Sequence, residues 1–446
     1  MRASEASERL PGAALEGAVR DPVETASREE LCALQLERLR ATVARVIASQ
    51  PPGAARLAEA SIAAPEDIAS LEDLAGIPFT WKDDLREHYP LGLLAVPRER
   101  VARIQASSGS HGKPTVVAYT RNDLDTWAEL MARCMTMAGV RPGMVVHNAN
   151  GYGLFTGGLG FHDGAERLGA TVIPVSGGFT ARQAMLLRDL GGQVLVSTPS
   201  YALAIAQAIR EAETAPARPR LELGLFGGEP WSEAMRGQIE AELGLSAVNF
   251  YGLSEMCGPG VAAECLAVRD GLHVQEDHFL AEVVDPRTGE PLAEGEPGEL
   301  VLTTLTKEAL PLIRYRTGDL ASLTTEPCAC GRTTARLLSL RGRRDEMLIV
   351  RGVNLFPSQI EHLLLGVEDV SPHYQLTVER PESMDELTVR CEPAGDGVDR
   401  SLLGERLERV LREHTGIRIA VEVVDAGTVP RSEGKAVRVV DRRLPR

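Results

Sequence analysis

The sequence predicts an α/β chain in which a large, multi-sheet N-terminal domain is followed by a small α+β C-terminal domain. Its 446 residues exceed the ~250–300 residues at which single hydrophobic cores stop growing, so two or more domains are expected. Between about residues 100 and 320, short β-rich runs alternate with helical stretches, which is typical of α/β units around largely parallel sheets. After residue 320 the order becomes strand, helix, strand, strand, helix, strand, which indicates a small α+β unit.

Each expected element follows from a local pattern. Ser27 and Glu30 form a capping-box pattern, and apolar residues from Leu31 to Ile47 then recur at helical spacing, which predicts an N-terminal helix. In the α/β region we expect strands at Met144–Val146, Thr171–Pro174, Gln193–Ser197 and Leu221–Phe226, and helices at Asp123–Ala138 and Ala181–Leu190. In the C-terminal region the expected elements are Met347–Val350, Pro357–Leu365, Tyr374–Glu379, Glu386–Cys391, Leu402–His414 and Val421–Asp425. The charged turn Gly342–Asp345 lies between two apolar runs, so we place the domains at 1–341 and 342–446.

Composition and charge exclude several classes of protein. With 43% hydrophobic and 25% charged residues, the chain is typical of globular proteins and not of disordered or fibrous ones. Its 48 Lys and Arg against 63 Asp and Glu give a net charge of −15, which removes the positive field that non-specific nucleic-acid binding needs. No apolar run reaches membrane-spanning length and the N-terminus lacks a secretory pattern, so we expect a cytoplasmic protein without a membrane partner.

Residues 107–115 form a Ser/Gly-rich loop that is suited to phosphate. Backbone amides and small hydroxyl side chains approach phosphate oxygens closely, so a triphosphate could be bound by Ser107, Ser108, Gly109, Ser110, His111, Gly112 and Lys113. The loop is not a Walker A motif, because Pro114 follows Lys113. A surface loop without a ligand is the alternative.

The chain has only four lysines, Lys82, Lys113, Lys307 and Lys435. Since arginine carries nearly all of the positive charge, each of these lysines raises the question why arginine does not occupy its position.

Four residues suggest a structural zinc site. Cys328 and Cys330 are one residue apart, and Cys265 and His273 lie roughly 55–60 residues upstream. Together they would complete a tetrahedral Cys₃His set, which is typical of structural Zn²⁺. His278 competes with His273 as the fourth ligand, and reduced cysteines in an ordinary hairpin are the alternative without metal.

Eight motifs in order resemble the phenylacetate–CoA ligase branch of the adenylate-forming superfamily of acyl- and aryl-CoA synthetases. The resemblance runs from Arg28 to Arg443, nearly the whole chain. The motifs are Phe79–Leu85, Ser107–Pro114, Gly151–Gly158, Phe250–Glu255, Tyr315–Leu320, Gly342–Asp345, Arg351–Glu361 and Pro430–Lys435.

The resemblance implies an AMP-forming aryl-acid ligase that needs ATP and Mg²⁺. Such enzymes join ATP and a carboxylate into an acyl-adenylate, and a nucleophile, usually the thiol of CoA, then displaces AMP. CoA is the expected acceptor here. Transfer to an amine or a hydroxyl, giving an amide or an ester, is the second hypothesis, and a catalytically silent nucleotide- or acid-binding relative is the third. The oligomeric state, monomer or homodimer, stays open.

The resemblance also assigns roles to single residues. It implies that Tyr251 stacks on adenine, that Asp319 and Arg343 hold the ribose, and that Glu255 holds Mg²⁺. It further implies that the nucleotide site includes Gly228, Glu229, Pro230, Gly252 and Ser254, and that Gly227 lines the acid site. Asp345 resembles the hinge about which the mobile C-terminal domain rotates. Lys435 resembles the catalytic lysine, whose compact ammonium group neutralises charge between carboxylate and α-phosphate.

Departures from the family pattern concern the acid. Relatives carry an aromatic residue where this chain has Asn150, and an amide facing a bare phenyl ring would cost on the order of 1–3 kcal/mol. We therefore expect a hydroxy- or amino-substituted benzoate, with Tyr152 and Phe155 stacking on its ring. The loop also has Ser110 and His111 in place of two threonines, and Gln105 where many relatives have histidine.

Overall fold

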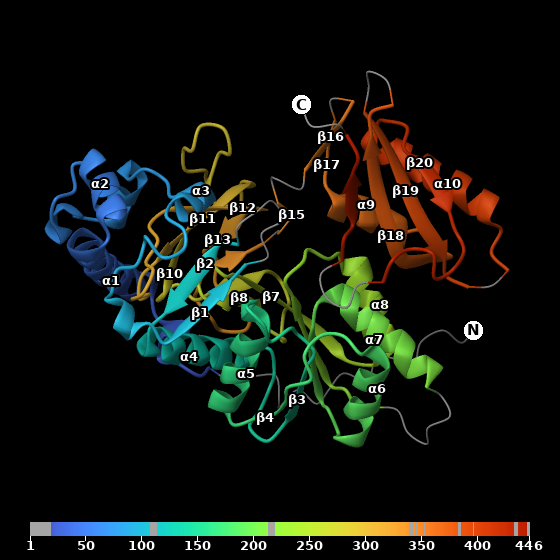
Figure 1. Ribbon diagram of the computed structural model, residues 1–446, viewed down its shortest axis with the longest axis horizontal. Coiled ribbons are helices and arrows are strands. Elements are labelled where there is room, and N and C mark those ends of the chain that lie inside the picture. Colours follow the sequence, from blue (N-terminus) through green and yellow to red (C-terminus); the bar gives the residue numbers. More distant parts are fainter. Residues whose placement is uncertain are drawn as a thin grey trace.

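The structure is a computed structural model that describes residues 19–107, 114–212, 219–338, 340, 342–343, 347–351, 353–381, 385–395, 397–431 and 436–443. A large part, residues 19–343, carries a nine-stranded and a four-stranded sheet, and a small part, residues 347–443, stands beside it (Figure 1). Each part has a hydrophobic core of its own. The α/β class with a large multi-sheet part and a small α+β part is confirmed.

The nine-stranded sheet forms the centre of the large part. Its strand order is β13-β14-β9-β8-β7-β6-β5-β3-β4. The strands are β3 (Val145–Asn148), β4 (Thr171–Ile173), β5 (Val194–Ser197), β6 (Leu223–Gly227), β7 (Ser246–Leu253), β8 (Gly258–Glu264), β9 (Leu272–Val274), β13 (Leu323–Thr324) and β14 (Arg336–Leu337). The neighbours β4, β3, β5, β6 and β7 pair in parallel, and the other pairs are antiparallel.

Helices cover both faces of the parallel strands, and for this reason successive side chains of one strand enter different cores. Val194 and Val196 belong to the cluster that contains residues of α4 and α5, whereas Leu195 belongs to the cluster formed with α6, α7 and α8. These helices are α4 (Arg121–Met137), α5 (Thr156–Leu168), α6 (Thr180–Asp189), α7 (Pro199–Glu211) and α8 (Glu233–Leu243). Every strand and helix expected in this region exists, with ends shifted by at most two residues.

The N-terminal segment packs in a separate core cluster that includes Leu280, Leu305 and Ile313 of the large part. Helix α1 (Arg28–Ser49) begins with the expected capping box, because the Ser27 hydroxyl accepts from the Glu30 amide and Glu30 reaches back to the Ser27 amide. The remaining helices here are α2 (Pro51–Glu59), α3 (Lys82–Glu87) and the 3₁₀ turns η1 (Pro22–Thr25), η2 (Pro65–Asp67), η3 (Leu71–Gly76) and η4 (Arg98–Arg100). Among the helices of the described ranges, none is long and apolar enough to span a membrane.

The expectation of largely parallel sheets is wrong for the region after β7. The four-stranded sheet, in the order β10-β11-β12-β15, is wholly antiparallel. Its strands are β10 (Phe279–Val284), β11 (Gly298–Thr304), β12 (Tyr315–Ala321) and β15 (Gly342–Arg343). No described helix lies between these strands, whereas parallel neighbours are usually joined by a crossover helix. The hairpin β1 (Arg103–Ala106) and β2 (Val116–Tyr119) flanks the Ser/Gly-rich loop.

The small part contains the six predicted elements in order, together with two strands that the sequence did not predict, β17 and β21. Its strand order is β20-β19-β18-β21, with α9 and α10 packed on one another and on this sheet. The elements are β16 (Leu348–Val350), β17 (Val353–Leu355), α9 (Pro357–Leu365), β18 (Val370–Glu379), β19 (Glu386–Pro393), α10 (Arg400–Thr415), β20 (Ala420–Val423) and β21 (Val439–Asp441). Gly342 and Arg343 still pair with β12 of the large part. The boundary between residues 341 and 342 stays a prediction.

Candidate active site

The first group of candidate residues lies where the parallel strands β6 and β7 end. Gly227 closes β6 in register with Phe250 of β7, so the turn Gly228–Pro230 leaves the sheet beside Tyr251. Gly228 has a φ of +83°, a conformation that L side chains rarely adopt, which explains glycine at this point. Ligands of α/β folds bind at the carboxyl ends of parallel strands, and this turn lies at that edge.

Tyr251 and Asp319 come from different sheets and meet at this edge. The Tyr251 hydroxyl donates a 2.6 Å hydrogen bond to Oδ2 of Asp319, which is 68 residues further along the chain. Asp319 on β12 is also the register partner of Arg343 on β15. The structure thus joins Tyr251 to Asp319 through their side chains, and Asp319 to Arg343 through the pairing of their strands.

Glu255 lies in the tight turn Ser254–Cys257 between β7 and β8. A Cβ on Gly252 would lie 1.9 Å from the carbonyl oxygen of Gly258, so only glycine permits the two strands to approach so closely here. The Ser254 hydroxyl contacts the hydroxyl of Thr156, at the start of α5, at 3.3 Å. Glu255 is buried, and its carboxylate has no hydrogen-bond partner among the described residues. A buried, available carboxylate is a suitable hard ligand for Mg²⁺.

Glu229 joins the large part to the small part. One carboxylate oxygen accepts from the Ser200 amide at 2.7 Å, and the other accepts from the Ala436 amide at 2.9 Å. Ser200 lies in the first turn of α7, where backbone amides have no partner within the helix and favour a negative charge. Ala436 directly follows Lys435. The segment beside the expected catalytic lysine therefore lies on the turn that carries the nucleotide candidates.

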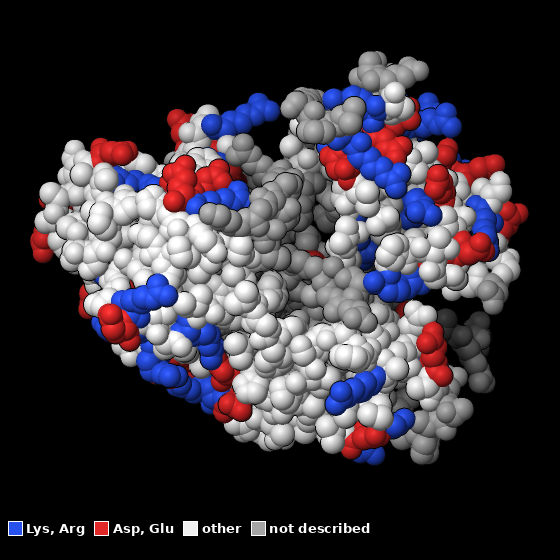
Figure 2. All heavy atoms as spheres, in the orientation of Figure 1, with Lys and Arg blue, Asp and Glu red and all other residues white. Residues whose placement is uncertain are grey.

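A second polar contact supports the same arrangement. Oε1 of the buried Glu361 accepts from the Ser232 amide at 3.2 Å, and Oε2 accepts from the Tyr374 hydroxyl at 3.1 Å. Burial raises the pKa of Glu361, and the guanidinium group of Arg438, 3.6 Å away, opposes this shift. Arg438 in turn donates to Ser200 Oγ at 3.2 Å. Figure 2 shows a hollow where the two parts meet.

The candidate acid residues follow β3. The Tyr152 ring is fixed because its hydroxyl accepts from the buried Asn148 amide at 2.8 Å and contacts His162 Nδ1 at 3.2 Å. Phe155, 38% exposed, precedes α5. Asn150 is half-buried, and its backbone amide donates to Asn148 Oδ1 at 3.2 Å. Among the described residues the side chain of Asn150 makes no hydrogen bond.

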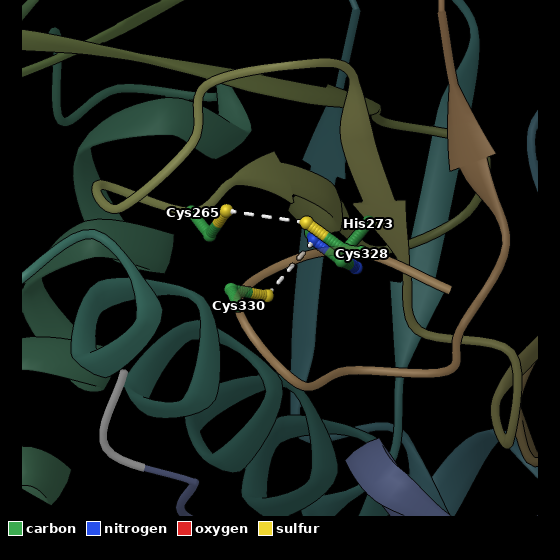
Figure 3. Close-up of side chains that lie close together, drawn as sticks. All are labelled: Cys265, His273, Cys328 and Cys330. Carbon is green, nitrogen blue, oxygen red and sulfur yellow. Dashed lines mark hydrogen bonds between the residues drawn. The ribbon is translucent and has the colours of Figure 1, made fainter. Parts of the chain in front are cut away.

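The four candidate zinc ligands lie together, away from this edge (Figure 3). Their ligand atoms all lie within 4.8 Å of one another, with Cys265 Sγ 3.9 Å from Cys328 Sγ and Cys330 Sγ 3.6 Å from His273 Nε2. His273 Nδ1 contacts the Thr334 hydroxyl at 3.1 Å, which leaves Nε2 facing the sulfurs. His278 instead contacts Asp277 and Thr306, so the choice between the two histidines falls on His273.

Several expected site residues lie outside the described residues. These are Ser108, Gly109, Ser110, His111, Gly112 and Lys113 of the Ser/Gly-rich loop, with Asp345 and Lys435. Of Arg343 the structure describes only the backbone. Ser107 is described, and its buried hydroxyl has no partner in the described part of the chain.

The sequence reasoning missed several residues that build the site. Asn148 orients Tyr152, and Ser200, Glu361 and Arg438 form the contact between the parts. A polar residue at the end of an apolar strand is a signal that could have found Asn148. Ser200 and Arg438 carry no sequence signal, and the motif Arg351–Glu361 includes Glu361 without indicating its contact. All three acquire their role only where the two parts meet.

Comparisons with known proteins agree with this geometry. The model of the AMP-binding enzyme family matches residues 10–305, and that of the AMP-binding enzyme C-terminal domain matches residues 352–443. A phenylacetate–coenzyme A ligase of Thermus thermophilus is 52% identical over 439 residues, which cover 94% of this chain and 98% of that protein.

Crystal structures of a 2-hydroxyisobutyryl-CoA ligase distinguish two arrangements of the parts. In its postadenylation state that enzyme is similar to this chain with a TM-score of 0.89 at 29% identity, covering 97% of this chain and 94% of its own. In its thioesterification state the TM-score is 0.70 at 31% identity, with coverages of 95% and 92%. The arrangement of the two parts here is therefore closer to the postadenylation state of that enzyme.

Proposed function

The chain belongs to the AMP-binding enzymes, in their phenylacetate–CoA ligase branch, and from this we propose that it activates an aromatic carboxylic acid with ATP and transfers the acyl group to CoA. The observation that carries the proposal is the hydrogen bond from the Ala436 amide to the Glu229 carboxylate. It joins the segment after Lys435 to the turn Gly228–Pro230. The names of the relatives support an ATP-dependent acyl- or aryl-CoA ligase. The choice of acid and the roles of single residues are proposals.

In the first half-reaction a carboxylate oxygen of the acid attacks the α-phosphorus of ATP, and pyrophosphate leaves. Tyr251 would stack on the adenine and Asp319 would accept hydrogen bonds from the ribose hydroxyls. Glu255 would hold the Mg²⁺ that accompanies the phosphates, since this ion supplies positive charge to the transferring group. The ammonium group of Lys435 would neutralise charge that develops between the acid and the α-phosphate.

In the second half-reaction the sulfur of CoA attacks the acyl carbon, the thiol proton is lost, and AMP leaves. We propose that residues 342–446 rotate about Asp345 between the two steps, because the contacts of Glu229 and Glu361 fit only one arrangement of the parts. The arrangement described here would serve adenylation. Transfer to an amine or a hydroxyl remains the second hypothesis for this step.

The substitution Lys435→Ala is expected to suppress adenylate formation and to leave folding and ATP binding unchanged. The lysine charge acts mainly in the transition state, so its loss should slow pyrophosphate release at least about 100-fold. Thioester formation from synthetic acyl-AMP should change much less. Single-turnover measurements of both half-reactions check this, and equal loss in both would exclude the role.

We further propose that the acid is a hydroxy- or amino-substituted benzoate. The Asn150 amide can both donate and accept, so it can satisfy a ring hydroxyl or amino group. The fixed ring of Tyr152, with Phe155, offers an aromatic surface beside it. The relatives at about half identity are named for phenylacetate, and this narrower substrate class rests on Asn150 alone.

A panel of acids tests both the reaction and the acid. Pyrophosphate release should be fastest with 2-amino-, 2-hydroxy- or 3-hydroxybenzoate, and kcat/KM should fall by about 100-fold or more for plain benzoate and phenylacetate. Asn150→Phe should shift the preference toward the unsubstituted acids. Omitting CoA, or replacing it with an amine, identifies the acceptor. Equal turnover of phenylacetate and the substituted benzoates would refute the acid class, and no pyrophosphate release with any acid would favour a silent relative.

We also propose that Cys265, His273, Cys328 and Cys330 hold a structural Zn²⁺. Sulfur ligands about 2.3 Å from a tetrahedral ion lie ~3.8 Å apart, close to the 3.9 Å found between Cys265 and Cys328. The guanidinium group of Arg332 donates to Cys330 Sγ at 3.7 Å and forms a buried ion pair with Glu24 at 2.6 Å. The N–H donor of Arg332 would stabilise negative charge on the Cys330 thiolate, and Glu24 holds the guanidinium group in place.

Metal analysis of the purified protein should find about one zinc per chain. Cys328→Ser should lose the metal and lower the melting temperature by several degrees, because the binding energy of a structural zinc is part of the folding energy. Cys32→Ser, which changes a cysteine on α1 outside the cluster, is the matched control and should retain zinc. A wild-type protein without zinc would contradict the proposal.

A further inference from the structure

Lys307 is a buried cation that the proposed chemistry does not use. It lies after β11, is 7% exposed, and belongs to a chain with only four lysines. Its ammonium group donates to the carbonyl oxygen of Glu255 at 2.9 Å and to that of Met256. Among the described residues it forms no ion pair with a carboxylate. Burying a charge is costly even when carbonyl groups compensate it, so packing alone does not explain this lysine.

The surroundings of Lys307 are rigid. The ammonium nitrogen lies 4.8 Å from the centre of the Tyr119 ring, which stacks on Trp127 at 5.3 Å. The Tyr119 hydroxyl donates to the Ser254 carbonyl at 3.2 Å. Both oxygens of Asp123 accept from backbone amides of the two residues that follow Lys307, at 2.6 and 2.9 Å. The side chains of Tyr119 and Lys307 therefore donate hydrogen bonds to three successive carbonyl groups, those of residues 254, 255 and 256.

Lysine suits this position better than arginine. Two carbonyls and an aromatic face satisfy a compact ammonium group, whereas a guanidinium group would need acceptors for five N–H donors in one plane. The adjoining cavity, lined by Asp123, Trp127, Cys257 and Lys307 among others, has room for about one water molecule and not for a larger cation.

We propose that Lys307 is a positioning residue that clamps the turn Ser254–Cys257 and thereby aims the Glu255 carboxylate at the Mg²⁺ of MgATP. The inference rests on the proposed role of Glu255 in metal binding. Substitution of a residue that orients a metal ligand through hydrogen bonds typically lowers metal affinity by roughly 10- to 100-fold. Lys307 acts on the backbone of the ligand and does not touch the substrates.

The test measures Mn²⁺ binding to the full-length protein in the presence of ATP, by electron paramagnetic resonance of the free ion. Lys307→Met, which keeps an unbranched side chain and removes the charge, should weaken Mn²⁺ binding about tenfold or more. ATP binding without metal and the KM of the acid should stay unchanged, and excess Mg²⁺ should restore part of the adenylation rate. Lys82→Met, on the half-exposed α3, is the matched control and should bind Mn²⁺ like the wild type.

Two further variants keep the proposal open to refutation. Tyr119→Phe removes only the bond to the Ser254 carbonyl and should weaken Mn²⁺ binding in the same direction, about two- to fivefold. Wild-type Mn²⁺ affinity in Lys307→Met, or in Tyr119→Phe if Lys307→Met does not fold, overturns the proposal. Glu255→Gln separates failure of the proposed metal-binding role of Glu255 from failure of the inference about Lys307. If this variant also binds Mn²⁺ normally, the proposed role of Glu255 fails, and the inference about Lys307 fails with it.

Discussion

The carboxylate of Glu229 is the contact on which the candidate active site depends. One of its oxygens accepts a hydrogen bond from the Ser200 amide in the first turn of α7, and the other accepts one from the Ala436 amide. A single side chain therefore holds the small part against the turn Gly228–Pro230. Glu361 adds a second bond across the boundary, to the Ser232 amide. Both contacts depend on how the two parts are arranged, which gives a physical reason for the proposed rotation between the two half-reactions.

The large part supplies a fixed frame for this contact. Parallel strands covered on both faces bring the turn Gly228–Pro230 and Tyr251 to one edge, and the antiparallel sheet brings Asp319 to the same place. Lys307 and Tyr119 donate hydrogen bonds to backbone carbonyl groups of the turn that carries Glu255. The large part therefore positions several polar groups at one edge, and the small part contacts this edge through the amide of Ala436.

Much of the fold could be predicted from the sequence because its signals are local. Helix α1 follows from the capping box at Ser27, and the strands between residues 144 and 227 follow from short apolar runs. The antiparallel sheet of residues 279–343 could not, because apolar runs alone do not reveal which strands pair. The four metal-ligand candidates followed from cysteine spacing, but the choice of His273 over His278 needed the pairing of β9 with β14. Contacts such as Arg438 with Ser200 depend on how the two parts meet, which no local pattern encodes.

One measurement tests most directly whether contact between the two parts serves adenylation. In Glu229→Gln the amide can accept only one of the two backbone bonds, so single-turnover adenylate formation should slow about tenfold, while thioester formation from synthetic acyl-AMP should change less than about threefold. Glu233→Gln, an exposed carboxylate on the neighbouring α8, is the control and should change neither rate. Equal slowing of both half-reactions, or no change in either, would contradict the role of this contact.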